Sequence, residues 1–362
     1  MRNKENKKRN LGIELLRMFL CFRIILHHYY SSYNKYMLQM KNNTFQVSCF
    51  FFISFYYLFP IISNRDTKRL KQRLERLLIP YTIHPIINLI LNNIIFLVFK
   101  INRYNRYLSL NDLKIQLIVG RGIYDVSVLW FIFNLMFFTL FFFIFAYIFK
   151  SRYLFLLQVL AIISYEFQYS GINFFFFAKY SKNIYMSVGN LIETFPISVF
   201  SLSLSSIKFH EILLNHRKKI LLFSLLFLYQ LSNYNIFFDV RGFSSKGIKN
   251  IFISLFLFSF FSVIPFDNVY SGLLLIITQF TKYTQGIYCL HVFFIYYFWL
   301  LFEKKGTLFG CFILYILSYF ISFIFKKNLS IFIIYTYIYQ LIQMAFYYTF
   351  YYIKFLNLFR YN

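Results

Sequence analysis

The fold is decided by the stretch Glu14-Leu-Leu-Arg17-Met-Phe-Leu-Cys-Phe-Arg23-Ile-Ile-Leu-His27-His28-Tyr-Tyr. It is apolar enough for a membrane-crossing helix, yet it carries one acid, two arginines and two histidines. Ionisable residues inside membrane segments are rare and energetically costly, so they are candidates for function. On a helix that advances about 100° per residue, Glu14, Arg17 and His28 lie on nearly one stripe, with Arg17 and His28 about 16 Å apart along the axis. We therefore interpret the other apolar segments as a scaffold around this stripe.

The composition is that of a helical membrane protein. Of the 362 residues, 59% are hydrophobic and only 14% are charged, which is too apolar for a soluble core. Several apolar runs of about 18 to 22 residues can each cross a hydrocarbon layer of about 30 Å as a helix. We predict an all-α transmembrane bundle of about ten spans, with about eleven as the alternative count.

The formal net charge of +26 is carried mostly by segments between the apolar runs. In a soluble protein this charge would suggest nucleic acid, but here it is expected to set the topology and to contact anionic lipid. Basic clusters at 1–9 and 65–76 are separated by two predicted spans, so both indicate that the N-terminus lies in the cytoplasm. Membrane lipids are therefore expected partners, and nucleic acid is not.

The predicted spans follow the apolar runs, and the stretch 272–302 is expected to divide into a short helix and a full span. The others cover 11–30, 44–63, 78–99, 127–149, 153–170, 187–207, 220–237, 248–265, 308–325 and 330–353. A short amphipathic helix is expected at 110–120, lying at the interface. This divides the chain into a basic cytoplasmic tail at 1–10, a transmembrane domain at 11–333 and an additional aromatic-rich segment at 334–362.

Several chemistries lack support in the sequence. The four cysteines lie in apolar segments without CxxC or metal-ligand spacing, so they are expected to be small buried side chains and no metal is expected. There is no HExxH, GxSxG, GxxxxGK[ST] or GxGxxG in a strand-helix context. Hydrolases, nucleotide-driven pumps and dinucleotide enzymes therefore have no motif support.

The polar groups of the first helix suggest a transfer reaction. A histidine is the usual general base for a hydroxyl near neutral pH, and an arginine three turns away suits phosphate groups of a donor. The alternative is that Glu14 and Arg17 pair near the cytoplasmic surface while the histidines snorkel at the other face. The run 65–76 likewise fits a loop bound to lipid headgroups, a polyanion site, or both. Tyr288 and His291 share a helical face at i, i+3, where packing is the commoner role of a histidine.

Five motifs follow one another along the chain: Glu14-x2-Arg17-x10-His28 with the ending His27-His28-Tyr29, Val47-Ser-Cys-Phe-Phe-Phe-Ile-Ser54, a basic loop from Arg69 that ends at Pro80, Leu129-Trp130-Phe131, and Gly286-Ile-Tyr288-Cys-Leu-His291. In this order, from about 9 to 333, they resemble the motifs of the membrane acyltransferases of the acyltransferase-3 type, in the branch that modifies polysaccharides. Two features depart from the family. Phe55 is bulky where the family usually has glycine after Ser54, so close helix approach is expected to be disturbed. The tail at 334–362 extends past the usual end.

The resemblance implies an integral membrane O-acyltransferase that moves an acyl group, expected to be acetyl, from a cytoplasmic acyl-CoA-type donor to a carbohydrate hydroxyl. It implies that His28 is the general base or proton carrier, and that Glu14 and Arg17 orient the inner half of a tunnel. The residues expected at the donor phosphates are Arg69, Arg73 and Arg76. Further site candidates are His27, Trp130, Tyr288 and His291.

The donor would be a co-substrate, and no permanently bound cofactor is expected. The plasma membrane is the expected location by default, and an internal membrane is the alternative. Two other functions stay open at this point. One is a transporter or flippase of glycan precursors, whose buried charges would line a pathway, although no inverted repeat is evident. The other is a relative that binds a partner without catalysis, for which Phe55 is the only indication.

Overall fold

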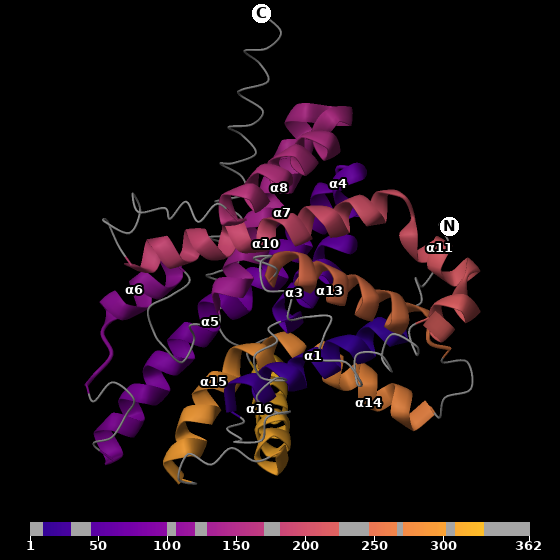
Figure 1. The fold of residues 1–362 in the computed structure, drawn as a ribbon. Helices are drawn as coiled ribbons and strands as arrows, with labels where there is room; N and C mark the ends of the chain where they lie inside the picture. The colour runs from indigo at the N-terminus through magenta and orange to yellow at the C-terminus, as the bar shows by residue number, and fades with distance from the viewer. Residues whose placement is uncertain are drawn as a thin grey trace, which may run out of the picture.

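The computed structural model describes residues 10–29, 45–99, 106–119, 129–169, 182–223, 246–265, 271–301 and 308–328. Every regular element in these residues is helical, which confirms the all-α prediction (Figure 1). The elements are α1 (Leu11–Tyr29), α3 (Phe45–Tyr56), α4 (Phe59–Ser63), α5 (Thr67–Phe99), α6 (Leu110–Val119), α7 (Trp130–Phe149), η2 (Lys150–Arg152), α8 (Tyr153–Tyr169), α10 (Lys182–Ser206), α11 (Phe209–Asn215), α13 (Lys246–Val263), α14 (Ser271–Lys282), α15 (Thr284–Leu301) and α16 (Leu308–Asn328).

Three helical stretches are long and apolar enough to cross a membrane: Gln46–Ser63, Thr67–Val98 and Trp130–Glu166. A fourth is formed if α10 and α11, which are bent by 64° to each other, are taken together. The count of ten or eleven spans and the cytoplasmic N-terminus stay predictions. The expected span at 330–353, most of the one at 220–237, the tail at 1–9 and the segment 334–362 lie outside the described residues.

Helix α1 lies near the middle of the bundle and packs against α3, α13, α14, α15 and α16 (Figure 1). Asn10 begins it, because the Asn10 side-chain oxygen accepts a hydrogen bond from the Ile13 backbone at 3.1 Å and its amide donates to the Ser262 carbonyl at 3.0 Å. A Cβ on Gly12 would lie 1.7 Å from the Phe261 carbonyl oxygen, so only glycine permits this approach of α1 to α13. The predicted first helix is confirmed.

The basic run that was expected to be a loop is the first part of α5, which begins at Thr67 rather than near 78. Arg65, at φ 48°, ends α4 in a Schellman turn, with the Asp66 and Arg65 backbone amides donating to the carbonyls of Ile61 and Ile62. The Asp66 carboxylate then caps α5 by accepting from the Arg69 backbone amide at 2.9 Å. These local signals start the helix eleven residues earlier than the hydropathy pattern alone indicates.

Helices α7 and α8 form a hairpin. The Asn134 amide donates to the Thr194 hydroxyl at 3.4 Å, and the Ser164 hydroxyl donates to the Ile192 carbonyl at 3.1 Å, so both helices meet the same part of α10. In one straight helix Asn134 and Ser164 would be about 45 Å apart. The chain therefore turns back at η2, as the sequence predicted for the fourth and fifth apolar segments, although the apolar stretch is continuous.

Phe55 is fully buried between α3 and α7, so its ring occupies the space in which a glycine would allow close backbone approach. Its ring stacks on Phe51 at 6.1 Å and meets Phe138 and Phe142 of α7 edge-on at 6.0 and 5.3 Å. The α3–α7 contact is thus filled by phenylalanine rings rather than by close backbone approach.

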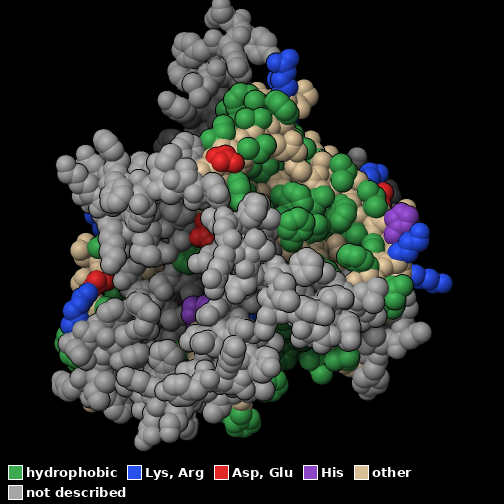
Figure 2. Space-filling model, viewed as in Figure 1, with side chains coloured by type: hydrophobic (Ala, Val, Ile, Leu, Met, Phe, Trp, Pro, Cys, Tyr) green, Lys and Arg blue, Asp and Glu red, His purple; other side chains and the backbone are tan. Residues whose placement is uncertain are grey.

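On the face shown in Figure 2, hydrophobic side chains make up much of the visible surface of the described helices. On α8, for example, Phe155 is 66% exposed and Ile162 64% exposed. Basic and histidine side chains gather at one edge, where α11 lies in the same view. An apolar surface of this extent suits contact with lipid and not with water.

The division of the late apolar stretch is also confirmed. Helix α14 ends at Lys282 and α15 begins at Thr284, so a short helix precedes a longer one. The expected helix at 110–120 is present as α6, and the stretch 308–325 lies within α16.

Candidate active site

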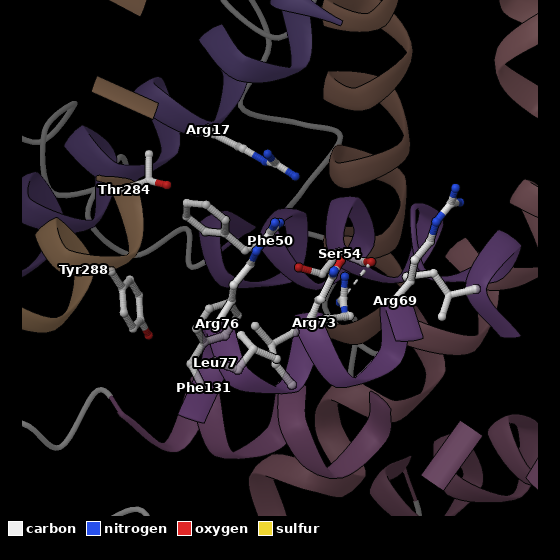
Figure 3. Close-up of a pocket in the computed structure, with 13 residues that line it drawn as sticks. Arg17, Phe50, Ser54, Arg69, Arg73, Arg76, Leu77, Phe131, Thr284 and Tyr288 are labelled. Atoms are coloured by element: carbon white, nitrogen blue, oxygen red, sulfur yellow. Dashed lines mark hydrogen bonds between the residues drawn. The ribbon is translucent and has the colours of Figure 1, made fainter. Parts of the chain in front are cut away.

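A pocket of about 480 Å³ lies between α1, α3, α5, α7 and α15 (Figure 3). Four arginines line it, one from α1 and three from α5, and no acidic side chain does among the residues that the structure describes. The lining residues are Arg17, Phe50, Ser54, Ile61, Arg69, Gln72, Arg73, Arg76, Leu77, Phe131, Leu135, Thr284 and Tyr288. The fold thus brings together the arginines of two sequence motifs that lie about fifty residues apart.

The pocket has a basic side and an aromatic side. Figure 3 shows Arg17, Arg73 and Arg76 reaching toward a common space, with Tyr288 on one side and Arg69 at the far end. The Tyr288 ring packs against Phe131 with centroids 4.9 Å apart. A site of this kind suits a ligand that has phosphate groups at one end and an uncharged arm at the other.

Arg17 forms an ion pair with Glu14, as the alternative interpretation of the first helix predicted. The Arg17 Nη1 donates to Glu14 Oε1 at 3.1 Å, and the Arg17 side chain keeps 31% exposure. Glu14 itself does not line the pocket. The ion pair and the pocket are therefore compatible: the acid orients the arginine, and the arginine faces the cavity.

Arg73 is fixed by two neighbouring helices. Near the end of α3 the Leu58 backbone amide donates to the Phe55 carbonyl at 3.1 Å, and not to the Ser54 carbonyl four residues back. The Ser54 carbonyl therefore lacks its usual helical donor. Arg73 Nη2 donates to that carbonyl at 3.2 Å, and Arg73 Nε donates to the Thr139 hydroxyl at 3.3 Å. Two directed bonds orient the guanidinium toward the pocket.

The other two arginines of α5 are less constrained. Arg69 pairs with Asp66 at 3.2 Å, in the turn that starts the helix. Arg76 is exposed and has no ion pair among the described residues. Arg76 therefore faces the cavity with its charge available to an anion.

Helices α1 and α15 run parallel with a constant offset. Cys21 Sγ donates to the Thr284 carbonyl at 3.4 Å, and seven residues further along each helix the rings of His28 and His291 lie 5.2 Å apart. The register therefore sets Arg17 near the start of α15 and His28 beside His291, about two turns beyond Thr284.

The histidines form a group next to the pocket and not inside it. The rings of His27 and His28 lie 5.1 Å apart, and the His291 ring lies 5.8 Å from Tyr288. His28 is exposed, whereas His291 is fully buried. Tyr288 connects the two regions, because it lines the pocket and also contacts His291.

Gly286 allows α15 to approach α16. A Cβ on Gly286 would lie 2.5 Å from Ser322 Oγ and 2.7 Å from Ser322 Cβ, which is closer than any relaxed contact. The glycine of the late motif therefore fixes the helix that carries Tyr288 and His291.

Trp130 lies outside the pocket. Its ring stacks on Phe51 at 6.5 Å, and the adjacent Phe131 is the residue of that motif that lines the cavity. Among the described residues, no group of three His, Cys, Asp or Glu side chains is placed to hold a metal ion.

Sequence reasoning missed two groups that position Arg73 and α15. Thr139 is the only serine or threonine in α7, and this lone aliphatic hydroxyl in an apolar run was a usable signal. Ser322 offered none, because a serine in an apolar helix is common and its role here depends on tertiary packing.

A family model described as an acyltransferase domain, of the acyltransferase-3 type, matches residues 10–327. The match begins at the residue that caps α1 and reaches the last turn of α16. No similar protein was found among the curated proteins, and no similar chain was found among the solved structures.

Proposed function

We propose, from the premise that this chain belongs to the acyltransferase-3 family of membrane acyltransferases, that it transfers an acyl group from an acyl-CoA-type donor to a carbohydrate hydroxyl. The acyl group would be acetyl and the acceptor a glycan, as in the polysaccharide-modifying branch. One observation carries the proposal: α1 places Arg17 in an arginine-lined pocket and His28 beside a second histidine, on one parallel pair of helices.

The arginine pocket suits the phosphate end of the donor. Coenzyme A carries a pyrophosphate and a further phosphate, and guanidinium groups bind such oxygens through paired hydrogen bonds. The pre-oriented Arg73 and the exposed Arg76 would bind first, with Arg69 and Arg17 at the margins. The walls formed by Phe50, Phe131 and Tyr288 suit the uncharged arm of the donor.

His28 supplies the base. Its ring lies about 16 Å along α1 from Arg17, so a donor held by its phosphates would extend toward it. The acceptor hydroxyl oxygen attacks the thioester carbonyl carbon while His28 takes the hydroxyl proton, and the carbon–sulfur bond then breaks to release a thiolate. Protonation of the thiolate completes the exchange of a thioester for an oxygen ester.

The protein would lie in the plasma membrane with its N-terminus in the cytoplasm. The donor would enter the pocket from that same side. A fluorescent protein fused before Met1 tests this orientation. Such a fusion matures in the cytoplasm and is dark when exported through an unfolded route, so a dark, membrane-inserted fusion would contradict it.

Transfer itself is tested with protein purified in detergent, acetyl-CoA labelled in the acetyl group, and a glycan acceptor. We expect label in the glycan, and we expect His28→Ala to lose transfer by about 10²-fold or more while inserting normally. Normal transfer by His28→Ala would remove His28 from the mechanism. No transfer by the unmodified protein, together with glycan flux into liposomes, would favour a transporter.

A further inference from the structure

A second histidine, His291 on α15, has a defined tautomer. Its Nδ1 lies 2.6 Å from the backbone carbonyl oxygen of Tyr288. A carbonyl oxygen only accepts hydrogen bonds, so Nδ1 must carry the hydrogen. In a neutral imidazole the other nitrogen then holds a lone pair, and Nε2 of His291 is therefore a proton acceptor.

The Nε2 atom is buried and has no hydrogen-bond partner among the described residues, and the His291 side chain is fully buried. Because Nδ1 is turned toward the backbone of its own helix, Nε2 points away from that backbone. Buried acceptors without partners are rare because they destabilise a fold, and they are commonly retained at functional sites.

The rings around His291 form an ordered series. Tyr288, which lines the arginine pocket, has its ring 5.8 Å from His291, and His28 has its ring 5.2 Å from His291 with an interplanar angle of 37°. His27 lies 5.1 Å from His28. From the pocket outward the order is therefore Tyr288, His291 and His28.

We propose that His291 is a proton-relay residue that acts through His28. This inference rests on the proposed acyl transfer. When the acceptor oxygen bonds to the thioester carbon, His28 takes the hydroxyl proton on one ring nitrogen and releases the proton of its other nitrogen to Nε2 of His291. When the carbon–sulfur bond breaks, that proton passes to the leaving thiolate. His291 returns to its neutral form, and the products are an oxygen ester and a thiol.

The substitution His291→Asn separates the relay from a structural role. The asparagine amide can still donate to the Tyr288 carbonyl, as Nδ1 does, but it has no basic nitrogen. We expect kcat for acyl transfer to fall by about 10²-fold and the KM for the donor to stay within about threefold. The matched control is His216→Asn, an exposed histidine at the end of α11, which should leave both constants unchanged.

Combining the substitution with His28→Ala gives the decisive comparison. If the two histidines act as one unit, the double variant transfers no more slowly than His28→Ala alone, because effects within a unit are not additive. Multiplied losses would show independent structural effects and overturn the relay. Unchanged kcat in His291→Asn would also overturn it, with the proposed function intact. The proposed function fails instead if the unmodified protein transfers no label.

A measurement that needs no substrate tests the same inference. The chain has six histidines, and ¹⁵N labelling of their rings distinguishes the two neutral tautomers and the imidazolium. We expect the signal that disappears in His291→Asn to be an imidazole with hydrogen on Nδ1 and none on Nε2 near neutral pH. An Nε2-protonated ring or an imidazolium at that position would overturn the relay.

Discussion

Replacing Gly286 by alanine tests whether the contact between α15 and α16 holds the site in place. The new Cβ would lie 2.7 Å from Ser322 Cβ, whereas carbon atoms at optimal contact are about 3.5 to 4.0 Å apart. The helices must therefore separate by about 1 Å, and overpacking of this kind costs about 1 to 3 kcal/mol. Alanine also favours a helix over glycine by about 1 kcal/mol, which hides part of that loss.

A double-mutant cycle removes this ambiguity. In a Ser322→Gly background the clash is absent while the helix preference of alanine remains, so Gly286→Ala should become neutral or stabilising there. The difference between the two backgrounds is the clash alone, about 1 to 3 kcal/mol. As a matched control, Ser206→Gly at the end of α10 should combine additively with Gly286→Ala.

The assay is denaturant unfolding in detergent micelles, followed by the fluorescence of the two tryptophans. Acyl transfer is measured on the same samples, and it should fall in Gly286→Ala and recover in the double variant, because Tyr288 and His291 move with α15. Coupling below about 0.5 kcal/mol would refute the close approach of the two helices.

Three further predictions concern other parts of the structure. Thr139→Val should raise the KM for the donor several-fold and leave kcat nearly unchanged, because losing the hydrogen bond to Arg73 costs about 1 kcal/mol. Thr139→Ser keeps the hydroxyl and should keep both constants. Equal constants for the two variants would contradict this. Phe55→Gly restores the usual residue of the family, yet it should destabilise the protein by at least about 3 to 5 kcal/mol, the cost of deleting a buried phenylalanine ring. An equal or higher unfolding midpoint would show that the ring does not stabilise the packing. The Arg106 guanidinium beside Asp112 holds the pKa of that carboxyl well below its usual range, so the pair stabilises the start of α6 above the unfolded pKa of about 3.9 and loses this contribution as the pH falls below it. The protection of α6 amides, measured as exchange relative to the intrinsic rate at each pH, should fall in that acid range. Asp112→Asn should show no such fall, and protection that is constant with pH in the unmodified protein would contradict the assignment.

The helices themselves could be predicted from hydropathy because each depends on a local run of apolar residues. Helix α1 and the break between α14 and α15 appear where the sequence indicated them. The start of α5 could not be predicted in this way, since Asp66 and the turn at Arg65 determine it by hydrogen bonds and not by hydropathy. The size of Phe55 alone does not show that the rings of Phe138 and Phe142 on α7 pack around it.

The site was predictable only in part. The motifs named Arg17, Arg73, Tyr288 and His28, but their spacing along the chain does not show which of them meet. The parallel register of α1 and α15 decides that Tyr288 faces the arginines and that His291 meets His28. Register between helices remote in sequence depends on the whole core, so only a structure supplies it.

The central claim is that α1 joins two separate functions, donor binding at the arginine pocket and proton transfer at His28. Calorimetric binding of acetyl-CoA, with single-turnover transfer measured beside it, tests this directly on His28→Ala and Arg73→Gln. For His28→Ala we expect unchanged donor affinity and transfer slowed by about 10²-fold. For Arg73→Gln we expect donor affinity weakened by about tenfold or more, because a charge-assisted contact is lost. Donor affinity lost equally in both variants, or in neither, would contradict it.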